Sequence, residues 1–246
     1  SSSGDRLYLT KDNAIVDYTV IPELSGNEAW GRPAGKPVFD LLSDPTPGSG
    51  NSGAANISQT PTADLPQGAY DNVSSITVSF SGTGEIYYTT DCTAPSRSSR
   101  RYTGPITITE TTVFRVAAYE SGASRSEILN LTYLVNENDS LSSVCLVTEP
   151  YNLWDYNYGI YVDGPNPGET YPYQGANYWR NWERSGSVAL FEEDGSLGFY
   201  EPCGLKIFGG YSRANGKKSF ACMFRGKYGA SSLDYPLFGE KGIDCY

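Results

Sequence analysis

Short runs in which apolar and polar residues alternate are the main pattern along this chain. ITVSF (76–80), EIYYTT (85–90) and PITIT (105–109) repeat with a period of two, and Gly, Pro or Asp residues lie beside them. A period of two places successive side chains on opposite faces of a strand, and closely spaced turn residues separate short strands. Apolar residues at helical spacing are scarce. The pattern therefore predicts a mostly β fold.

Changes in composition divide the chain into four parts. Residues 1–51 hold strand-like pieces, and the Pro-, Gly- and Ser-rich residues 52–69 have the composition of a linker. Closely spaced alternating strands fill residues 70–135, as in a small β-sandwich. Residues 136–246 form a further β-rich part in which Tyr and Trp are abundant. Inside this last part, EEDGS predicts a hairpin turn because Asp-Gly is a common two-residue turn.

The net charge and the missing histidine exclude several functions. Lys and Arg number 18 against 28 Asp and Glu, and the formal net charge of −10 disfavours nucleic acid and acidic membrane surfaces as partners. No apolar run approaches the length of a membrane span. Without His, the chain lacks Ser-His and Cys-His catalysis and most zinc chemistry. We therefore expect no nucleic-acid partner, no membrane span and no metal site.

The cysteines are widely spaced, without a CxxC pair, so they do not favour a zinc site. Several disulfide pairings fit them, and buried free thiols are the alternative. Scattered cysteines in an acidic, Tyr- and Asn-rich chain are typical of an extracellular or cell-surface protein. The five residues are Cys92, Cys145, Cys203, Cys222 and Cys245.

A cationic block between Cys203 and Leu233 contrasts with the acidic remainder, because it contains no Asp or Glu. Such a block attracts anions, and glycines let backbone amides approach an anion closely. A strand lysine can add a point charge to a phosphate site. The alternative is a set of solvated side chains, or of pairs with acids elsewhere in the sequence. The basic residues are Lys206, Arg213, Lys217, Lys218, Arg225 and Lys227.

The segment GRPAGKPVFDLLSDPTPGSGN (31–51) resembles the carboxyl end of a lamin-tail-like domain. The Gly-Arg turn of that family corresponds to Gly31 and Arg32. Its Pro-Thr-Pro-Gly-x-x-Asn exit corresponds to residues 45–48 and Asn51. The resemblance implies that residues 1–51 hold only the second half of such a β-sandwich.

The run IYYTTDCTAPS, followed by YTGPITITETTVFRVAAY, resembles the C-terminal-type domain of chitobiases, a fibronectin-III-like sandwich. Cys92 stands where that family usually has Gly in a Thr-Asp-Gly turn. A cysteine there is either recruited into a disulfide or merely tolerates the turn. In its relatives this domain is mostly a spacer, so the resemblance implies no chemistry for residues 70–135.

Four segments together look like the amino-terminal part of the spore-coat-protein-H (CotH) family of atypical kinases: NLWDYNYGIYVDG, NYWRNWERSGSVALFEEDGSLGF, CGLKIFGGYSRANGKKSF and KYGASSLDYPLF. In that family Gly-Gly-x-Ser-Arg and the following Lys-Ser-Phe belong to the nucleotide-binding lobe. Phe208 stands where many relatives have His. The resemblance and the cationic block together give the candidate phosphate-binding residues Lys206, Gly209, Gly210, Ser212, Arg213 and Lys218.

Kinase chemistry also needs carboxylates that hold a metal and orient the attacking hydroxyl. In the CotH family these acids lie downstream of the matched segments, where residues 239–246 supply only Glu240 and Asp244. We therefore expect half a nucleotide site, no catalytic residue and no cofactor in this chain. ATP and Mg²⁺ are expected only in a longer parent, whose kinase activity stays open.

The aromatic stretch at residues 151–182 offers a different function. Exposed Trp and Tyr rings can stack on sugars, so Trp154, Trp179 and Trp182 are candidates for a carbohydrate-binding module that takes a polysaccharide. The alternative is core packing, because Tyr and Trp bury a large area while they keep a polar group.

Two of the resemblances cover half a domain each, so the chain is expected to begin and end inside domains. Uncovered strand edges invite pairing with other strands. Partners would then be other protein chains or copies of this chain, as in a coat- or filament-forming protein built by strand complementation. The full expectation is a modular, extracellular, bacterial-type protein of tandem small β-sandwich units, followed by a truncated β-rich kinase-like N-lobe.

Overall fold

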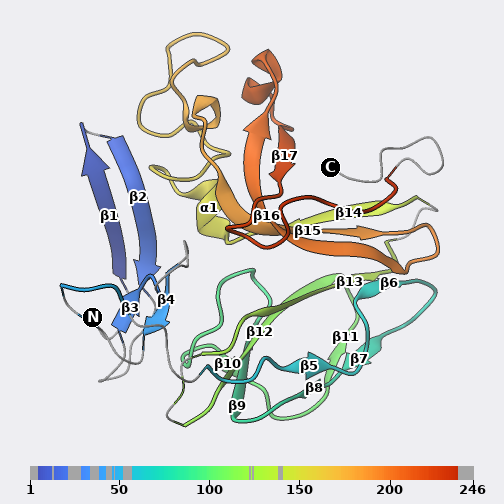
Figure 1. Ribbon diagram of the computed structural model, residues 1–246. Helices are drawn as coiled ribbons and strands as arrows, with labels where there is room; N and C mark the ends of the chain where they lie inside the picture. Colours follow the sequence, from blue (N-terminus) through green and yellow to red (C-terminus); the bar gives the residue numbers. More distant parts are fainter. Residues whose placement is uncertain are drawn as a thin grey trace. The chain divides into compact units, whose positions relative to one another are not determined.

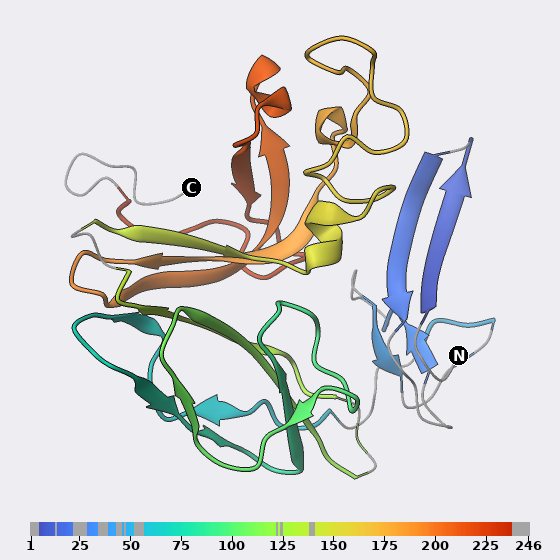
Figure 2. The ribbon, with the colours of Figure 1, turned by 180° about the vertical axis from the view of Figure 1, so that it is seen from behind.

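The structure is a computed structural model, drawn in Figure 1 and from behind in Figure 2. Strands dominate it and its helices are few and short, which confirms the predicted mostly β fold. The chain divides into a first unit, residues 1–66 with 72–135, and a second unit, residues 67–71 with 136–246. The structure describes residues 5–12, 14–21, 29–33, 39–42, 46, 48–51, 57–121, 123, 125–137 and 141–237.

Two hairpins open the first unit. β1 (Asp5–Lys11) pairs antiparallel with β2 (Ala14–Ile21), and β3 (Ala29–Gly31) pairs antiparallel with β4 (Asp40–Leu42). The indole Nε1 of Trp30 donates to Thr19 Oγ1 at 2.6 Å, which links the two hairpins. The lamin-tail resemblance of this region stays a prediction.

Near the end of this region, Asn51 lies beside the predicted Gly-Arg turn. Its Nδ2 donates to the carbonyl of Arg32 at 2.9 Å, and an Arg32–Asp17 ion pair of 2.7 Å joins the turn to β2. Two positions that the resemblance singled out therefore meet in space. Pro45 and Pro47 of the same motif lie outside the described residues.

The rest of the first unit is built from short strands, as the period-two runs predict. In one sheet the strand order is β10-β9-β12-β13, and the pairs β11-β7 and β5-β8 form smaller sheets. β5 lies within the stretch whose composition resembles a linker, and β6 (Gly68–Tyr70), which begins in that stretch, belongs to the second unit. The strands of the first unit are β5 (Thr62–Ala63), β7 (Ile76–Val78), β8 (Phe80–Ser81), β9 (Glu85–Thr89), β10 (Arg100–Arg101), β11 (Ile106–Ile108), β12 (Thr112–Tyr119) and β13 (Leu129–Val135).

Aromatic side chains fill the core of this unit. The buried Phe114 ring meets the rings of Phe80, Tyr88 and Tyr133 edge to face, with centroids 5.4, 5.7 and 6.1 Å apart. Such edge contacts add to the free energy gained from burying the rings. The alternating runs of the sequence place these side chains on the inner face.

Cys92 has a φ of 64°, in the left-handed region that glycine adopts most readily. This backbone explains why a family with the same turn would use Gly at that position. The Cys92 carbonyl accepts a hydrogen bond from Nη1 of Arg115 at 2.7 Å, and the backbone N–H of Thr93 donates to Asp91 Oδ1 at 3.0 Å. These bonds hold the turn in place.

The second unit contains a four-stranded antiparallel sheet in the order β14-β15-β16-β17. The β15–β16 hairpin turns at Asp194 and Gly195, where the backbone N–H of Glu192 donates to the Ser196 carbonyl at 2.8 Å, so the predicted turn is confirmed. The elements are β14 (Ser143–Val147), α1 (Pro150–Trp154), η1 (Asn177–Trp179), β15 (Arg184–Phe191), β16 (Leu197–Phe208), η2 (Tyr211–Ala214) and β17 (Ser219–Met223).

Candidate functional site

The predicted phosphate-binding segment forms the connection between β16 and β17, which we name the β16–β17 turn (residues 209–218). Gly209 has a φ of 119°, and a Cβ there would collide with Ser212 Oγ, so this position requires glycine. Five of the six candidate residues lie in this turn, and Lys206 lies on β16 just before it. One local connection thus brings the candidates together.

Lys218 points back into the turn. Its Nζ donates to the carbonyls of Arg213 at 2.7 Å and Asn215 at 2.9 Å. The same ammonium lies 4.0 Å from the ring centroid of Tyr178 and 5.2 Å from that of Tyr161. Burial lowers the pKa of Lys218, because desolvation disfavours the ammonium form. Lys218 therefore braces the turn, and its role as a phosphate contact stays a prediction.

Arg213 is held in the same way. Its Nε donates to the Gly209 carbonyl at 2.6 Å, its Nη1 donates to the Tyr178 carbonyl at 3.4 Å, and its guanidinium lies 5.7 Å from the ring centroid of Trp179. A guanidinium carries five N–H donors. These contacts use two of them and fix the orientation of the remaining three.

A buried hydrophobic cluster packs against Ala214 of the turn. Ile160, Ala176, Tyr178 and Ile207 are each at most 2% exposed and pack together. Burial, followed by a hydrogen bond to Asp163, raises the pKa of Tyr178 to about 12. Sequence reasoning missed Tyr178 and Asp163, because nothing in their local pattern connects them with a lysine so far along the chain.

The cationic block is partly neutralised by Glu183, which lies just before β15. Its carboxylate pairs with Nε of Arg225 at 3.1 Å and with Nζ of Lys227 at 2.9 Å. Burial opposes ionisation of Glu183, but hydrogen bonds from Lys227, Tyr228 and Arg225 outweigh it and lower the pKa of the carboxyl. The remaining basic residues of the block are therefore those in or beside the β16–β17 turn.

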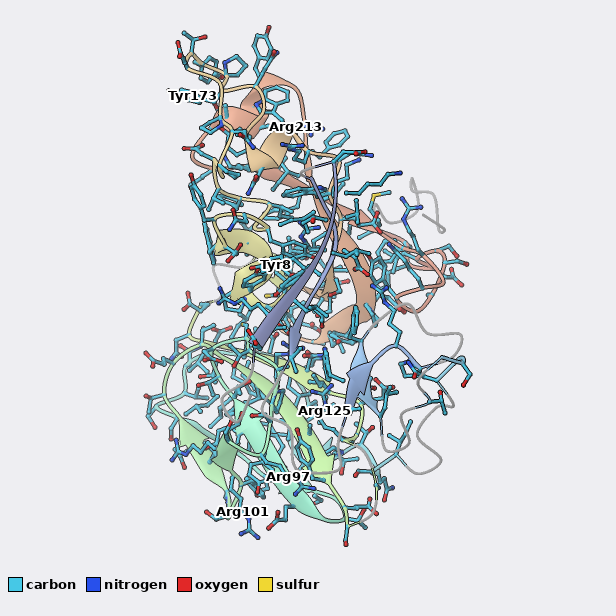
Figure 3. The ribbon with its side chains drawn as sticks, turned by 90° about the vertical axis from the view of Figure 1, so that its left-hand side faces the viewer. Tyr8, Arg97, Arg101, Arg125, Tyr173 and Arg213 are labelled. Carbon is cyan, nitrogen blue, oxygen red and sulfur yellow. The ribbon has the colours of Figure 1, made fainter. Side chains whose placement is uncertain are left out.

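An exposed aromatic group is formed by the loop before η1 together with Tyr211 of this turn, and we name it the tyrosine cluster (Tyr171, Tyr173 and Tyr211). Tyr171 lies 6.1 Å from Tyr173 and 6.4 Å from Tyr211 between ring centroids, with interplanar angles of 82° and 81°. The hydroxyl of Tyr171 donates to the Tyr211 carbonyl at 3.3 Å. Figure 3 shows Tyr173 and Arg213 toward the same end of the second unit.

The three tryptophans proposed for sugar binding have different surroundings. Trp179 and Trp182 are half-buried and pack against the buried hydrophobic cluster that contains Ile160 and Tyr178. Trp154, in contrast, is 56% exposed. The Trp154 ring lies 5.0 Å from that of Tyr161. Two of the three thus serve in packing, and their sugar-binding role stays a prediction.

Acidic groups that could hold a metal are not gathered in the described part of the chain. Among residues 5–237, apart from the undescribed gaps, no three His, Cys, Asp or Glu side chains come together in a metal-binding arrangement. Glu240 and Asp244 lie outside the described residues.

The four described cysteines are free thiols, in contrast to the expected disulfides. The Cys203 thiol donates a hydrogen bond to Cys222, which together with burial raises the pKa of Cys203. Cys222 opposes Leu205 in the β16–β17 ladder, so the two cysteines are diagonal neighbours. Diagonal Cα atoms lie about 7–8 Å apart, beyond the reach of an unstrained disulfide. Cys245 lies outside the described residues.

Comparison with known proteins identifies one part of the chain. Residues 65–130 match the family model of the chitobiase/beta-hexosaminidase C-terminal domain. Neither a curated protein nor a solved structure matches the chain. None of the described helices is long and apolar enough to span a membrane. The chitobiase-type resemblance is therefore supported, while the CotH and lamin-tail resemblances stay predictions.

Proposed function

We propose that the second unit binds the phosphate groups of a nucleotide at the β16–β17 turn, without transferring them. The observation that carries this proposal is the pair Arg213 and Lys218, which backbone carbonyls hold at one glycine-dependent turn. Because an ammonium carries three N–H donors and two of those of Lys218 are bound, one is left for an anion. Fixed cations of this kind need no reordering when phosphate arrives.

The distribution of charge supports the same position. Glu183 pairs with Arg225 and Lys227 and offsets one of their two charges, so most of the remaining positive charge of the block lies at Lys206 and at the three cations of the turn, Arg213, Lys217 and Lys218. Lys217 and Ser212 are exposed. A phosphate placed over the turn would meet this local positive potential in an otherwise acidic chain.

In the whole protein, this lobe would be one module among several. The chain contains a chitobiase-type domain at residues 65–130. We infer that this domain acts as a spacer in an extracellular or cell-surface protein whose second unit is CotH-like. The motif order in residues 136–246 supports this assignment, and catalytic carboxylates would come from a longer parent.

Titration of the chain with ATP, with and without Mg²⁺, tests the phosphate site. Lys218→Ala is expected to weaken ATP binding by about tenfold to a hundredfold, because it removes a charge-assisted hydrogen bond. Arg225→Ala is the matched control, since it removes a cation of the same block that pairs with Glu183. Equal losses in both variants, or no ATP binding by the unmodified chain, would overturn the proposal. Mg²⁺-dependent phosphotransfer by this chain would contradict its non-catalytic part.

A second candidate function is assembly with other chains. β1 and β2 form a two-stranded sheet on which Leu7 and Leu9 are 57% and 61% exposed. A two-stranded sheet is only marginally stable alone, and its open edges can pair with further strands. This favours a partner chain, or another copy of this chain, at the N-terminal hairpin.

A further inference from the structure

We propose that the tyrosine cluster is a binding surface for a neutral, β-linked polysaccharide. This inference does not depend on the phosphate site, and it places sugar binding at tyrosines, two of them in the aromatic stretch 151–182, instead of at the three tryptophans named from the sequence. It starts from exposure: Tyr171, Tyr173 and Tyr211 are 55%, 39% and 64% exposed although their rings lie next to one another. Single exposed aromatic rings are common, but contiguous exposed rings usually mark a binding site.

Hydrogen bonds hold the loop that carries the cluster in one conformation. The single O–H of Tyr171 is shared between the Tyr211 carbonyl at 3.3 Å and Asn215 Oδ1 at 3.4 Å. The indole Nε1 of Trp179 donates to the Pro172 carbonyl at 2.8 Å. Figures 1 and 2 show this loop, which precedes η1, beside the β16–β17 connection from both sides. Because these bonds hold the Tyr171 ring and the backbone at Pro172, a ligand would lose less affinity to the ordering of this part of the loop.

The chemistry around the rings indicates a neutral, hydroxyl-rich ligand. Residues 164–178 contain one charged side chain, Glu169, and several amides and hydroxyls. The turn that carries Tyr211 adds three cations, of which Arg213 and Lys218 donate to backbone carbonyls of the turn and Lys217 is exposed. Asn166, Thr170 and Gln174 are exposed on this loop and can bond to hydroxyl groups. A β-linked hexopyranose with equatorial substituents presents an apolar C–H face to an aromatic ring and hydroxyls at its edge. The tyrosine rings can therefore contact the C–H face of such a sugar, and the polar side chains of the loop can bond to its hydroxyl groups.

The angles between the rings distinguish a polysaccharide from a flat ligand. Tyr171 stands at 82° to Tyr173 and at 81° to Tyr211, so their faces point in different directions. A planar base can stack on only one of them. Successive sugar units of a chain can turn and meet one ring after another, which a single ring system cannot do.

Titration with cellohexaose, chitohexaose and laminarihexaose, followed by calorimetry, tests this surface. Tyr173→Ala and Tyr211→Ala are each expected to weaken binding of at least one of these oligosaccharides by about tenfold. Tyr156→Ala is the matched control, because Tyr156 is 62% exposed but lies outside the cluster. It should bind like the unmodified chain. Near-ultraviolet circular dichroism verifies that each variant keeps the native fold.

Three results would overturn the proposal. One is no binding of any of the three oligosaccharides at millimolar concentration. Another is binding that Trp154→Ala removes and that Tyr173→Ala and Tyr211→Ala leave unchanged. The third is self-association that both cluster variants abolish while no oligosaccharide binds, which would make the cluster a protein interface. ATP binding retained by Tyr173→Ala, which lies outside the β16–β17 turn, would show that this surface and the phosphate site are independent.

Discussion

At the scale of single residues, Lys218 stabilises the β16–β17 turn and is also the proposed phosphate contact. Its ammonium closes the β16–β17 turn through the carbonyls of Arg213 and Asn215, and it lies over the Tyr178 ring. Removal of this side chain would disturb the turn as well as any bound phosphate. A variant that changes the support and keeps the lysine therefore isolates the contribution of the support to stability.

Tyr178→Phe is such a variant, because it removes the hydroxyl and keeps the ring. The pKa of Tyr178 is about 12 in the folded chain, above the ordinary value of 10.0. The folded state thus holds a proton that the unfolded chain releases, so its contribution to stability is complete below pH 10 and disappears as pH rises towards 12. We expect Tyr178→Phe to lose about 1 kcal/mol at neutral pH, from the lost hydrogen bond to Asp163.

Urea unfolding of both proteins at neutral pH and between pH 10 and 12 measures this effect. The difference in stability between the unmodified chain and Tyr178→Phe should shrink as the pH rises through this window. Tyr156→Phe, at an exposed position, should follow the unmodified chain throughout. A constant difference across the window would contradict the assigned pKa.

At the scale of elements, the β16–β17 turn depends on a single backbone conformation. Gly209→Ala puts a side chain at a φ of 119° and against Ser212 Oγ. We expect it to destabilise the second unit by about 1–3 kcal/mol and to weaken ATP binding, because the turn positions both cations. Gly216→Ala, in the same turn, has nothing within 4 Å of the added Cβ and should change stability by less than about 0.5 kcal/mol. Thermal unfolding and ATP titration of the two variants measure this, and equal behaviour would refute the requirement for glycine.

The elements also show what the sequence could predict. Period-two runs predicted the strands of the first unit, and Asp194-Gly195 predicted the β15–β16 hairpin, because both signals are local. The CotH resemblance identified the residues of the β16–β17 turn as candidates for phosphate binding. It could not supply the pairing of Glu183 with Arg225 and Lys227, since this depends on which strands become neighbours. The aromatic stretch 151–182 was a sugar-binding candidate from the sequence, but the tyrosine cluster could not be predicted for the same reason, since Tyr171 and Tyr211 meet only in the folded chain.

At the scale of the whole molecule, the chain combines a domain of the chitobiase type with a second unit of different chemistry. The first unit has an aromatic core, and the candidate ligand surfaces lie on the second. Under the proposals made above, the chitobiase-type domain acts as a spacer and the second unit carries the binding surfaces. This division does not explain why Leu7 and Leu9 are exposed on the β1–β2 hairpin.

We expect those leucines to mediate association between chains. Leu7 and Leu9 lie two residues apart on β1, so both point to the same face, and burial against a second apolar surface would stabilise a complex. Leu9→Lys is expected to abolish association, because a lysine cannot be buried there without a partner. Thr10→Lys is the matched control, since it adds the same charge at the next exposed position. Sedimentation equilibrium over a range of concentrations should show the unmodified chain and Thr10→Lys associating and Leu9→Lys remaining a monomer. A monomeric unmodified chain at every concentration would exclude self-association, and partners would then have to be sought among other proteins.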